Sequence, residues 1–219
     1  MSVPLVTVVT ATWQRPRTIM ERAIPSLAAQ DYPGDRIQHL IVTDGHDPGL
    51  NAVLHAAGYS ESDQLRKLVN MGRNWSGPEA RGGCGVAARL VGAWLAAGEY
   101  TGYLDDDNTY LPHHVRAMAA ALESSGADFA TSRWRMGAPG SFVMGDPNPG
   151  RGRTDTTGIM HKTSILPHGD WRMDGYESDG ALVERWLANG RTHVHVPEAT
   201  FVLYPHRYGA PDGPRAVAV

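Results

Sequence analysis

The sequence predicts a single α/β domain built on a mostly parallel sheet flanked by helices, and three observations lead to that prediction. Strand and helix signals alternate through the first half of the chain, which favours parallel strands joined by helical crossovers. The 219 residues suit one domain and supply enough chain for a substantial core. The chain also contains no internal repeat and no low-complexity tract, so we expect one domain with two halves.

The first half supplies the clearest elements. Apolar, often β-branched runs predict strands over residues 5–10, 39–43, 67–71 and 100–104. Helical spacing predicts one helix from Pro16 to residue 28, kinked by Pro25. A second helix is expected over 86–97, with Trp94 and Ala97 on its apolar face and Gly98 as its C-cap, and a third over 113–124, followed by Gly126.

The second half is less regular. Strands are expected over residues 129–134, 192–196 and 200–204, and a helix over 178–188 with Leu187 facing inward and Gly190 after its end. Residues 137–157 are rich in Gly, Pro, Asp and Asn. A loop of that length inside a compact domain is usually functional or mobile.

Composition excludes several classes of protein. Lys and Arg total 20 against 23 Asp and Glu, a net charge of -3, which argues against binding to nucleic acid by bulk electrostatics. The single cysteine, Cys84, excludes an internal disulfide and a zinc ribbon. The longest apolar stretch contains Arg89 and Glu99, so no transmembrane segment is predicted, and the N-terminus does not resemble a signal peptide. We expect a cytoplasmic protein.

The strongest candidate site is the run Tyr-Leu-Asp-Asp-Asp-Asn at residues 103–108. It places Asp105, Asp106 and Asp107 at the end of an apolar strand, where open α/β sheets bind their ligands. Carboxylates this close repel one another and favour a cation, and Mg²⁺ held by one or two carboxylates usually completes its shell with substrate phosphates. An acidic turn that caps the following helix is the alternative, and the triplet alone does not decide between the two.

Polar groups follow two other predicted strands. Asp44 ends one of them, a position where aspartate commonly binds ribose or base, although Asp-Gly is also an ordinary turn. Thr10, Thr12 and Arg15 lie at the end of the first strand, where they either contact a ligand or cap the next helix.

Other candidates also have two interpretations. Glu177 and Asp179 precede or begin a helix, where a carboxylate stabilises the N-terminus or serves as a general base. Arg81 and Arg89 bind phosphate or are surface charges. His206 becomes interesting only if a metal binds.

Two more histidines, His193 and His195, share one face of a predicted strand. A zinc hydrolase site there would need a third ligand that the pattern does not supply, so a structural role is favoured.

In their order and spacing these segments resemble a family-2 glycosyltransferase of the GT-A fold. The resemblance covers nearly the whole chain and is carried by residues 8–16, 26–33, 40–45, 96–108 and 177–185, with Gly190. Two positions depart from the family pattern. Leu90 follows Arg89 where the family often has Asn, and the usual Glu-Asp pair is spread over Glu177 and Asp179, which leaves Glu177 as an alternative base.

The resemblance implies a role for most candidates. Asp107 would hold Mn²⁺ or Mg²⁺ on the diphosphate, His206 matches a C-terminal metal-binding histidine of many such enzymes, and Asp179 matches the catalytic carboxylate. The residues implied to contact the nucleotide are Thr10, Thr12, Arg15, Asp44, Asp105 and Asp106.

The implied reaction moves a sugar from a UDP, dTDP or GDP donor to an acceptor hydroxyl. Residues 1–110 would bind the nucleotide, and residues 111–219 would bind the acceptor and supply the base. The metal stabilises the diphosphate leaving group, the base takes the acceptor proton, and one displacement inverts the anomeric configuration. A homo-oligomer is compatible with this interpretation, and no nucleic-acid partner is expected.

Two other functions stay open. A nucleotidyltransferase on a related fold would require a glycine-rich phosphate loop after the first strand, and residues 10–15 contain no glycine. A nucleotide-sugar-binding protein without turnover would not need Asp179, so the variant Asp179→Asn distinguishes it from an enzyme.

Overall fold

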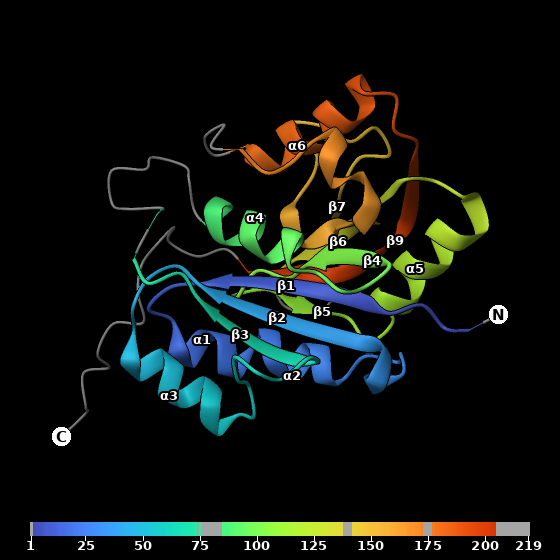
Figure 1. The fold of residues 1–219 in the computed structure, drawn as a ribbon. Helices are drawn as coiled ribbons and strands as arrows, with labels where there is room; N and C mark the ends of the chain where they lie inside the picture. The colour runs from blue at the N-terminus through green and yellow to red at the C-terminus, as the bar shows by residue number, and fades with distance from the viewer. Residues whose placement is uncertain (1, 74, 76–84, 138–141, 173–176, 205–219) are drawn as a thin grey trace.

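A mixed β-sheet runs through the centre of the molecule, with helices on both of its faces (Figure 1). The computed structural model describes residues 2–73, 75, 85–137, 142–172 and 177–204. Within these residues the strand order is β3-β2-β1-β4-β8-β6-β9-β5, and β7 pairs with β6 beside this path.

The first four strands of this order are parallel. They are β1 (Val6–Thr12), β2 (Ile37–Thr43), β3 (Arg66–Asn70) and β4 (Tyr100–Tyr103). All four were predicted, within two residues at most ends. Because they are parallel, their carboxyl ends meet at one edge of the sheet, which is the edge that carries the acidic triplet.

The other half of the sheet is mixed. Strand β8 (Ile159–Lys162) is antiparallel to both β4 and β6 (Phe129–Met136), while β9 (His193–Leu203) is parallel to β6. Two short strands complete the sheet, β5 (Thr109–Tyr110) against β9 and β7 (Val143–Met144) against β6.

Two predictions for this half were wrong. Strand β8 was missed because it has only four residues and includes a histidine. That residue, His161, is fully buried and bonds the hydroxyl of Tyr103 at 2.9 Å. The two predicted closing strands are one strand, β9, in which a register shift against β6 accommodates the interruption near Pro197.

One face of the sheet is covered by α1 (Pro16–Glu21), α2 (Ala23–Ala28), α3 (Pro48–Ala56) and α5 (His114–Ser125) (Figure 1). The predicted helix over 16–28 is in fact two helices, with the break at Arg22 (φ -124°, ψ -76°). The break lies before Pro25, because a proline in the first turn of α2 leaves no hydrogen bond unmade.

The opposite face is covered by α4 (Val86–Trp94) and α6 (Ser178–Ala188) (Figure 1). Helix α4 ends before the predicted C-cap at Gly98, which packs on β1 instead: a Cβ there would lie 2.6 Å from the backbone nitrogen of Thr7. The inward positions predicted for Trp94, Ala97 and Leu187 are also wrong, since all three are exposed.

Left-handed glycines end α5 and α6 as predicted, at Gly126 (φ 71°) and Gly190 (φ 73°). Three short 3-10 turns complete the described elements: η1 (Gly34–Arg36), η2 (Thr156–Gly158) and η3 (Thr163–His168). None of the helices in the described ranges is long and apolar enough to cross a membrane.

Candidate active site

The carboxyl ends of β1, β2 and β4 bring the main sequence candidates together. The backbone N–H of Asp44 donates to the carbonyl of Thr12 at 2.9 Å, and that of Leu104 donates to Val9 at 3.0 Å, so the three strand ends remain adjacent beyond the sheet. Asp44, Asp106 and the side chain of Thr12 are buried there.

The first group of side chains at this edge is the Arg15 cluster, which we define as Thr12, Arg15, Asp106 and Asp107. Arg15 Nη1 donates to Asp106 Oδ1 at 2.9 Å and also pairs with the carboxylate of Asp107. The hydroxyl of Thr12 donates to Asp106 Oδ2 at 2.8 Å. Burial, followed by the neighbouring charge of Asp107, raises the pKa of Asp106. A carboxylate in this position gains from a cation beside it.

Arg22, at the break between α1 and α2, joins a further segment to this cluster. Its Nη1 donates to the backbone carbonyl of Asp107 at 2.8 Å, and its guanidinium carbon lies 4.4 Å from the ring centroid of Tyr204. The backbone N–H of Tyr204 also donates to Asn108 Oδ1 at 3.3 Å. The chain that leaves β9 therefore starts beside Asp107.

The second group is the Arg89 cluster, which consists of Arg89, Asp105, Asp155 and Asp179. Arg89 Nη2 donates to Asp105 Oδ1 at 2.5 Å. Asp155, which begins η2, and Asp179, in the first turn of α6, both lie within the electrostatic range of this guanidinium. The cluster thus unites α4, the triplet, the η2 turn and α6.

Burial dominates the electrostatics of this second cluster. It raises the pKa of Asp179 to about 6, against the opposing effects of the Gly180 N–H and Arg89. Burial, followed by the charges of Asp105 and Asp179, also raises the pKa of Asp155. A carboxylate with a pKa near neutrality can accept a proton at physiological pH and release it again, as general-base chemistry requires.

The ring of Trp171 supports Arg89 from one side. This tryptophan is 2% exposed, its ring lies 5.4 Å from the Arg89 guanidinium, and it contacts Tyr103 edge-on at 5.0 Å. Arg89 is therefore held between a carboxylate and an aromatic face. Its side chain is only 12% exposed, so Arg89 is not the surface charge that was one alternative from the sequence, and its binding to phosphate stays a prediction.

The two carboxylates proposed as bases lie in different environments. Glu177 is exposed at the N-terminus of α6, where its side chain makes no capping hydrogen bond. Asp179 is partly buried, accepts the N–H of Gly180 at 2.7 Å and faces the hydroxyl of Thr156 at 3.4 Å. Gly180 permits this packing, because a Cβ there would lie 2.4 Å from the Cα of Arg151.

Asp44 has a partner that the sequence did not indicate. Its Oδ1 accepts the backbone N–H of Trp75 at 2.8 Å. The indole of Trp75 is 51% exposed, and the guanidinium carbon of Arg73 lies 3.8 Å from its centroid. An exposed aromatic ring thus lies next to the aspartate that we expected to bind a nucleobase.

Other predicted residues stay outside these groups. Thr10 is fully buried and its hydroxyl bonds His39 Nε2 at 3.0 Å, away from both clusters. Arg81 and His206 lie outside the described residues.

The histidine pair on β9 shows no metal-site geometry. His193 Nε2 and His195 Nδ1 both face the hydroxyl of Thr131, at 2.8 and 3.4 Å. In the described part of the chain, no three His, Cys, Asp or Glu side chains are arranged to hold a metal ion.

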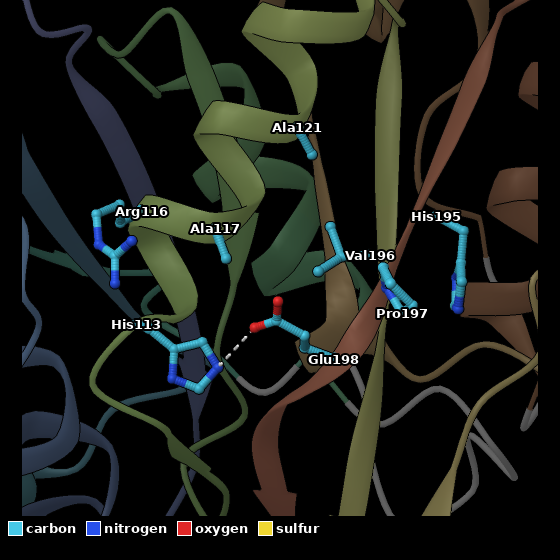
Figure 2. A pocket seen from close by; sticks show the side chains of 8 residues that line it. All are labelled: His113, Arg116, Ala117, Ala121, His195, Val196, Pro197 and Glu198. Atoms are coloured by element: carbon cyan, nitrogen blue, oxygen red, sulfur yellow. Dashed lines mark ion pairs between the residues drawn. The ribbon is translucent and has the colours of Figure 1, made fainter.

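A pocket of about 300 Å³ lies between α5 and β9 (Figure 2). His113 points toward Glu198 at 3.8 Å, whereas His195 lies on the far side of Pro197. None of the residues that line this pocket belongs to the Arg15 cluster or the Arg89 cluster.

A divalent cation fits the Arg15 cluster by its chemistry. Carboxylate oxygens of Asp106 and Asp107 converge on one nitrogen of Arg15, so two hard oxygen donors already face one cationic centre. Because the described residues offer no third ligand of this kind, phosphate oxygens or water would complete the shell of Mg²⁺ or Mn²⁺.

Sequence reasoning missed Asp155, Arg22 and Trp75. Asp155 stands before Thr-Thr-Gly inside the long loop, and the Asp-x-Thr pattern of a capped turn was the available signal. Nothing in the local sequence marks Arg22 or Trp75, because their contacts are with residues distant in the chain.

Comparisons with known proteins identify the family and the fold of the chain. The family model described as Glycosyl transferase family 2 matches residues 7–171. A search of curated protein sequences found no significant match. Solved structures match at low identity, and they confirm the prediction of a GT-A fold.

One such structure is S. aureus TarS 1-349, with a TM-score of 0.68 and 18% identity over 91% of this chain and 60% of that chain. The same protein in complex with UDP-GlcNAc matches with a TM-score of 0.68 and 16% identity over 93% and 59% of the two chains.

A third is the mannosyltransferase PcManGT from Pyrobaculum calidifontis in complex with GDP-Man and Mn²⁺, with a TM-score of 0.67 and 16% identity over 95% and 59%. The chain therefore spans about three fifths of the length of these structures.

Proposed function

The chain belongs to glycosyl transferase family 2, and on that premise we propose that it transfers a sugar from a nucleoside diphosphate donor to an acceptor hydroxyl. The observation that carries the proposal is the meeting of the triplet Asp105–Asp107 with Asp179 at one edge of the sheet. The Arg15 cluster offers oxygen ligands for a cation that would bind the diphosphate, and the Arg89 cluster offers Asp179, a carboxylate of raised pKa.

The donor would bind along the carboxyl ends of β1, β2 and β4. Asp44 and Trp75 would bind the base, and Asp105 or Asp106 would bind the ribose; the exposed ring of Trp75 beside Asp44 supports the first assignment. Arg15 would exchange its carboxylate partners for phosphate oxygens. The structures of similar fold that hold UDP-GlcNAc and GDP-Man with Mn²⁺ support a nucleotide-sugar donor and a divalent ion.

The ion, Mn²⁺ or Mg²⁺, would be held by Asp107, with His206 as a further ligand carried over from the family pattern. Its chemistry is to stabilise the charge that grows on the diphosphate as the anomeric bond breaks.

Asp179 would accept the proton of the acceptor hydroxyl while that oxygen attacks the anomeric carbon from the face opposite the leaving group. A single displacement of this kind inverts the anomeric configuration. The partly buried position of Asp179 and its pKa near 6 support it over the exposed Glu177.

Release of nucleoside diphosphate from a panel of donors tests the proposal. UDP-, dTDP- and GDP-sugars are incubated with the full chain and Mn²⁺, and free nucleoside diphosphate is quantified with and without simple alcohol acceptors. We expect release from donors of one base, lost in Asp107→Ala. Binding of a donor without any release, unchanged in Asp179→Asn, would favour the binding protein without turnover.

A further inference from the structure

The hydroxyl of Thr157, in the η2 turn, bonds both ends of the loop of residues 105–108, which contains the acidic triplet. It accepts a hydrogen bond from Asn108 Nδ2 at 2.9 Å and faces the backbone N–H of Asp105 at 3.4 Å. Thr157 is fully buried and Asn108 is 2% exposed, so water does not compete for these bonds. One oxygen atom therefore fixes where the loop of residues 105–108 begins and where it ends.

The same turn reaches the proposed base. Thr156, the residue before Thr157, directs its hydroxyl at Asp179 Oδ2 at 3.4 Å. Asp155 closes the turn by accepting the N–H of Thr157 at 2.9 Å. Consecutive residues of one turn thus contact the loop of residues 105–108 and the carboxylate of Asp179.

The turn has little freedom to move. It packs against β4, β6 and β9, and a Cβ at Gly158 would lie 3.0 Å from the ring of Phe201 and 3.2 Å from the carbonyl oxygen of Ser132. A turn that is packed this closely transmits a displacement of its own atoms to the residues around it. Loss of the Thr157 hydroxyl would therefore be felt at the triplet.

We propose that Thr157 is a positioning residue, which holds the triplet loop through Asn108 and Asp105 in register with Asp179 across the two halves of the site. This inference rests on the proposed function, since the register matters only if a donor bound at the triplet must meet a base on α6. Positioning of this kind contributes to catalysis without contact with the substrate.

The test compares Thr157→Val, which keeps the shape and removes the hydroxyl, with Thr157→Ser, which restores it. The probe is the dissociation constant of UDP and of GDP, each with Mn²⁺. For whichever nucleotide the wild type binds, we expect Thr157→Val to raise the dissociation constant by roughly tenfold, the effect of about one lost hydrogen bond. Thr157→Ser should bring the dissociation constant back to within about twofold of the wild-type value.

Thr101→Val is the matched control. Thr101 on β4 is also fully buried, and its hydroxyl bonds that of Thr163 at 2.8 Å, outside both clusters. Thr101→Val should lower the melting temperature about as much as Thr157→Val, yet leave nucleotide affinity within about twofold. Equal loss of affinity in both variants would mean that Thr157 only stabilises the fold.

Asn108→Ala removes the same hydrogen bond from its other side, and this single variant, which should also raise the dissociation constant by roughly tenfold, serves if Thr157→Val does not fold. Where both single variants fold, the double variant completes a double-mutant cycle. The nucleotide dissociation constant of the double variant should be no more than about twofold above that of the single variant with the lower affinity. Independent, multiplicative losses would overturn the positioning role.

The wild-type chain separates this inference from the proposed function. If it binds neither nucleotide with Mn²⁺, the proposed function fails and the inference fails with it. If the wild type binds and Thr157→Val binds equally well, the inference alone is overturned.

Discussion

The two clusters at the edge of the sheet both pair an arginine with aspartates, but they differ in where those aspartates come from in the chain. In the Arg15 cluster, neighbouring residues of one loop, Asp106 and Asp107, converge on a single guanidinium nitrogen. In the Arg89 cluster, the carboxylates come from three separate segments and surround a cation that Trp171 holds in place. On the proposed function, the first cluster would exchange the Arg15 guanidinium for a metal ion that carries the diphosphate, whereas the second joins distant parts of the chain.

This contrast teaches that the three carboxylates of the triplet face two different arginines. Asp105 turns toward Arg89 and the acceptor half, and Asp106 and Asp107 turn toward Arg15 and the first helix. The predictions below test whether the two clusters separate binding from turnover.

The largest expected effect is on binding through the Arg15 cluster. Asp107→Ala removes the proposed metal ligand, so Mn²⁺-dependent affinity for a nucleoside diphosphate should disappear from calorimetric titrations. Asp107→Asn, which keeps one oxygen donor, should retain a small part of it. Wild-type affinity in Asp107→Ala would remove this residue from the metal site.

The next largest expected effect is on turnover, through Asp179 of the Arg89 cluster. Asp179→Asn removes the proposed base and should lower kcat by about 10²–10⁴-fold while nucleotide affinity stays unchanged. Glu177→Gln is the matched control, with an expected kcat near that of the wild type. If the two variants exchange these results, the base is Glu177.

The third prediction is that the two clusters contribute differently to the free energy of unfolding. Arg89→Met leaves Asp105, Asp155 and Asp179 without their shared guanidinium, and should cost about 3–5 kcal/mol in the free energy of unfolding measured with urea. Arg15→Met should cost less, because Thr12 still bonds Asp106, and Mn²⁺ with a nucleotide should recover part of the loss. If both variants lose the same unfolding free energy, and Mn²⁺ with a nucleotide restores none of it in Arg15→Met, the distinction between the two clusters would be contradicted.

The smallest effect is a pH dependence of stability. Burial raises the folded-state pKa of Asp179 from 3.8 to about 6, so the ionised carboxylate destabilises the fold above that range, and the cost is relieved as the pH falls toward 4. Asp179→Asn should therefore raise the unfolding free energy at pH 8 by up to about 3 kcal/mol and by little at pH 4. A variant equally or less stable than the wild type at pH 8 would show that Asp179 is not strained by burial.

The first half of the chain, residues 1–110, was well predicted from sequence for a physical reason. Its strands are contiguous apolar runs that end in polar residues, so the pattern of β4 followed by Asp105–Asp107 carries both the element and the site. The parallel arrangement then follows from the alternation of strands and helices.

The second half, residues 111–219, was predicted less well, because its structure depends on contacts between residues distant in the chain. Strand β8 is held by pairing on both sides, and its buried His161 bonds the hydroxyl of Tyr103, which lies far away in the sequence. Thr156 and Thr157 lie in a loop whose sequence shows a turn, but their hydrogen-bond partners lie in α6 and after β4. Local pattern cannot reveal such pairings.

Thermal unfolding against UDP, GDP, dTDP and CMP, each with and without Mn²⁺, tests the central claim most directly. A ligand that binds only the folded chain raises its melting temperature by mass action. We expect a Mn²⁺-dependent rise with one nucleoside diphosphate, absent in Asp107→Ala, which would also identify the donor base. No rise with any of the four would contradict a donor site at the triplet.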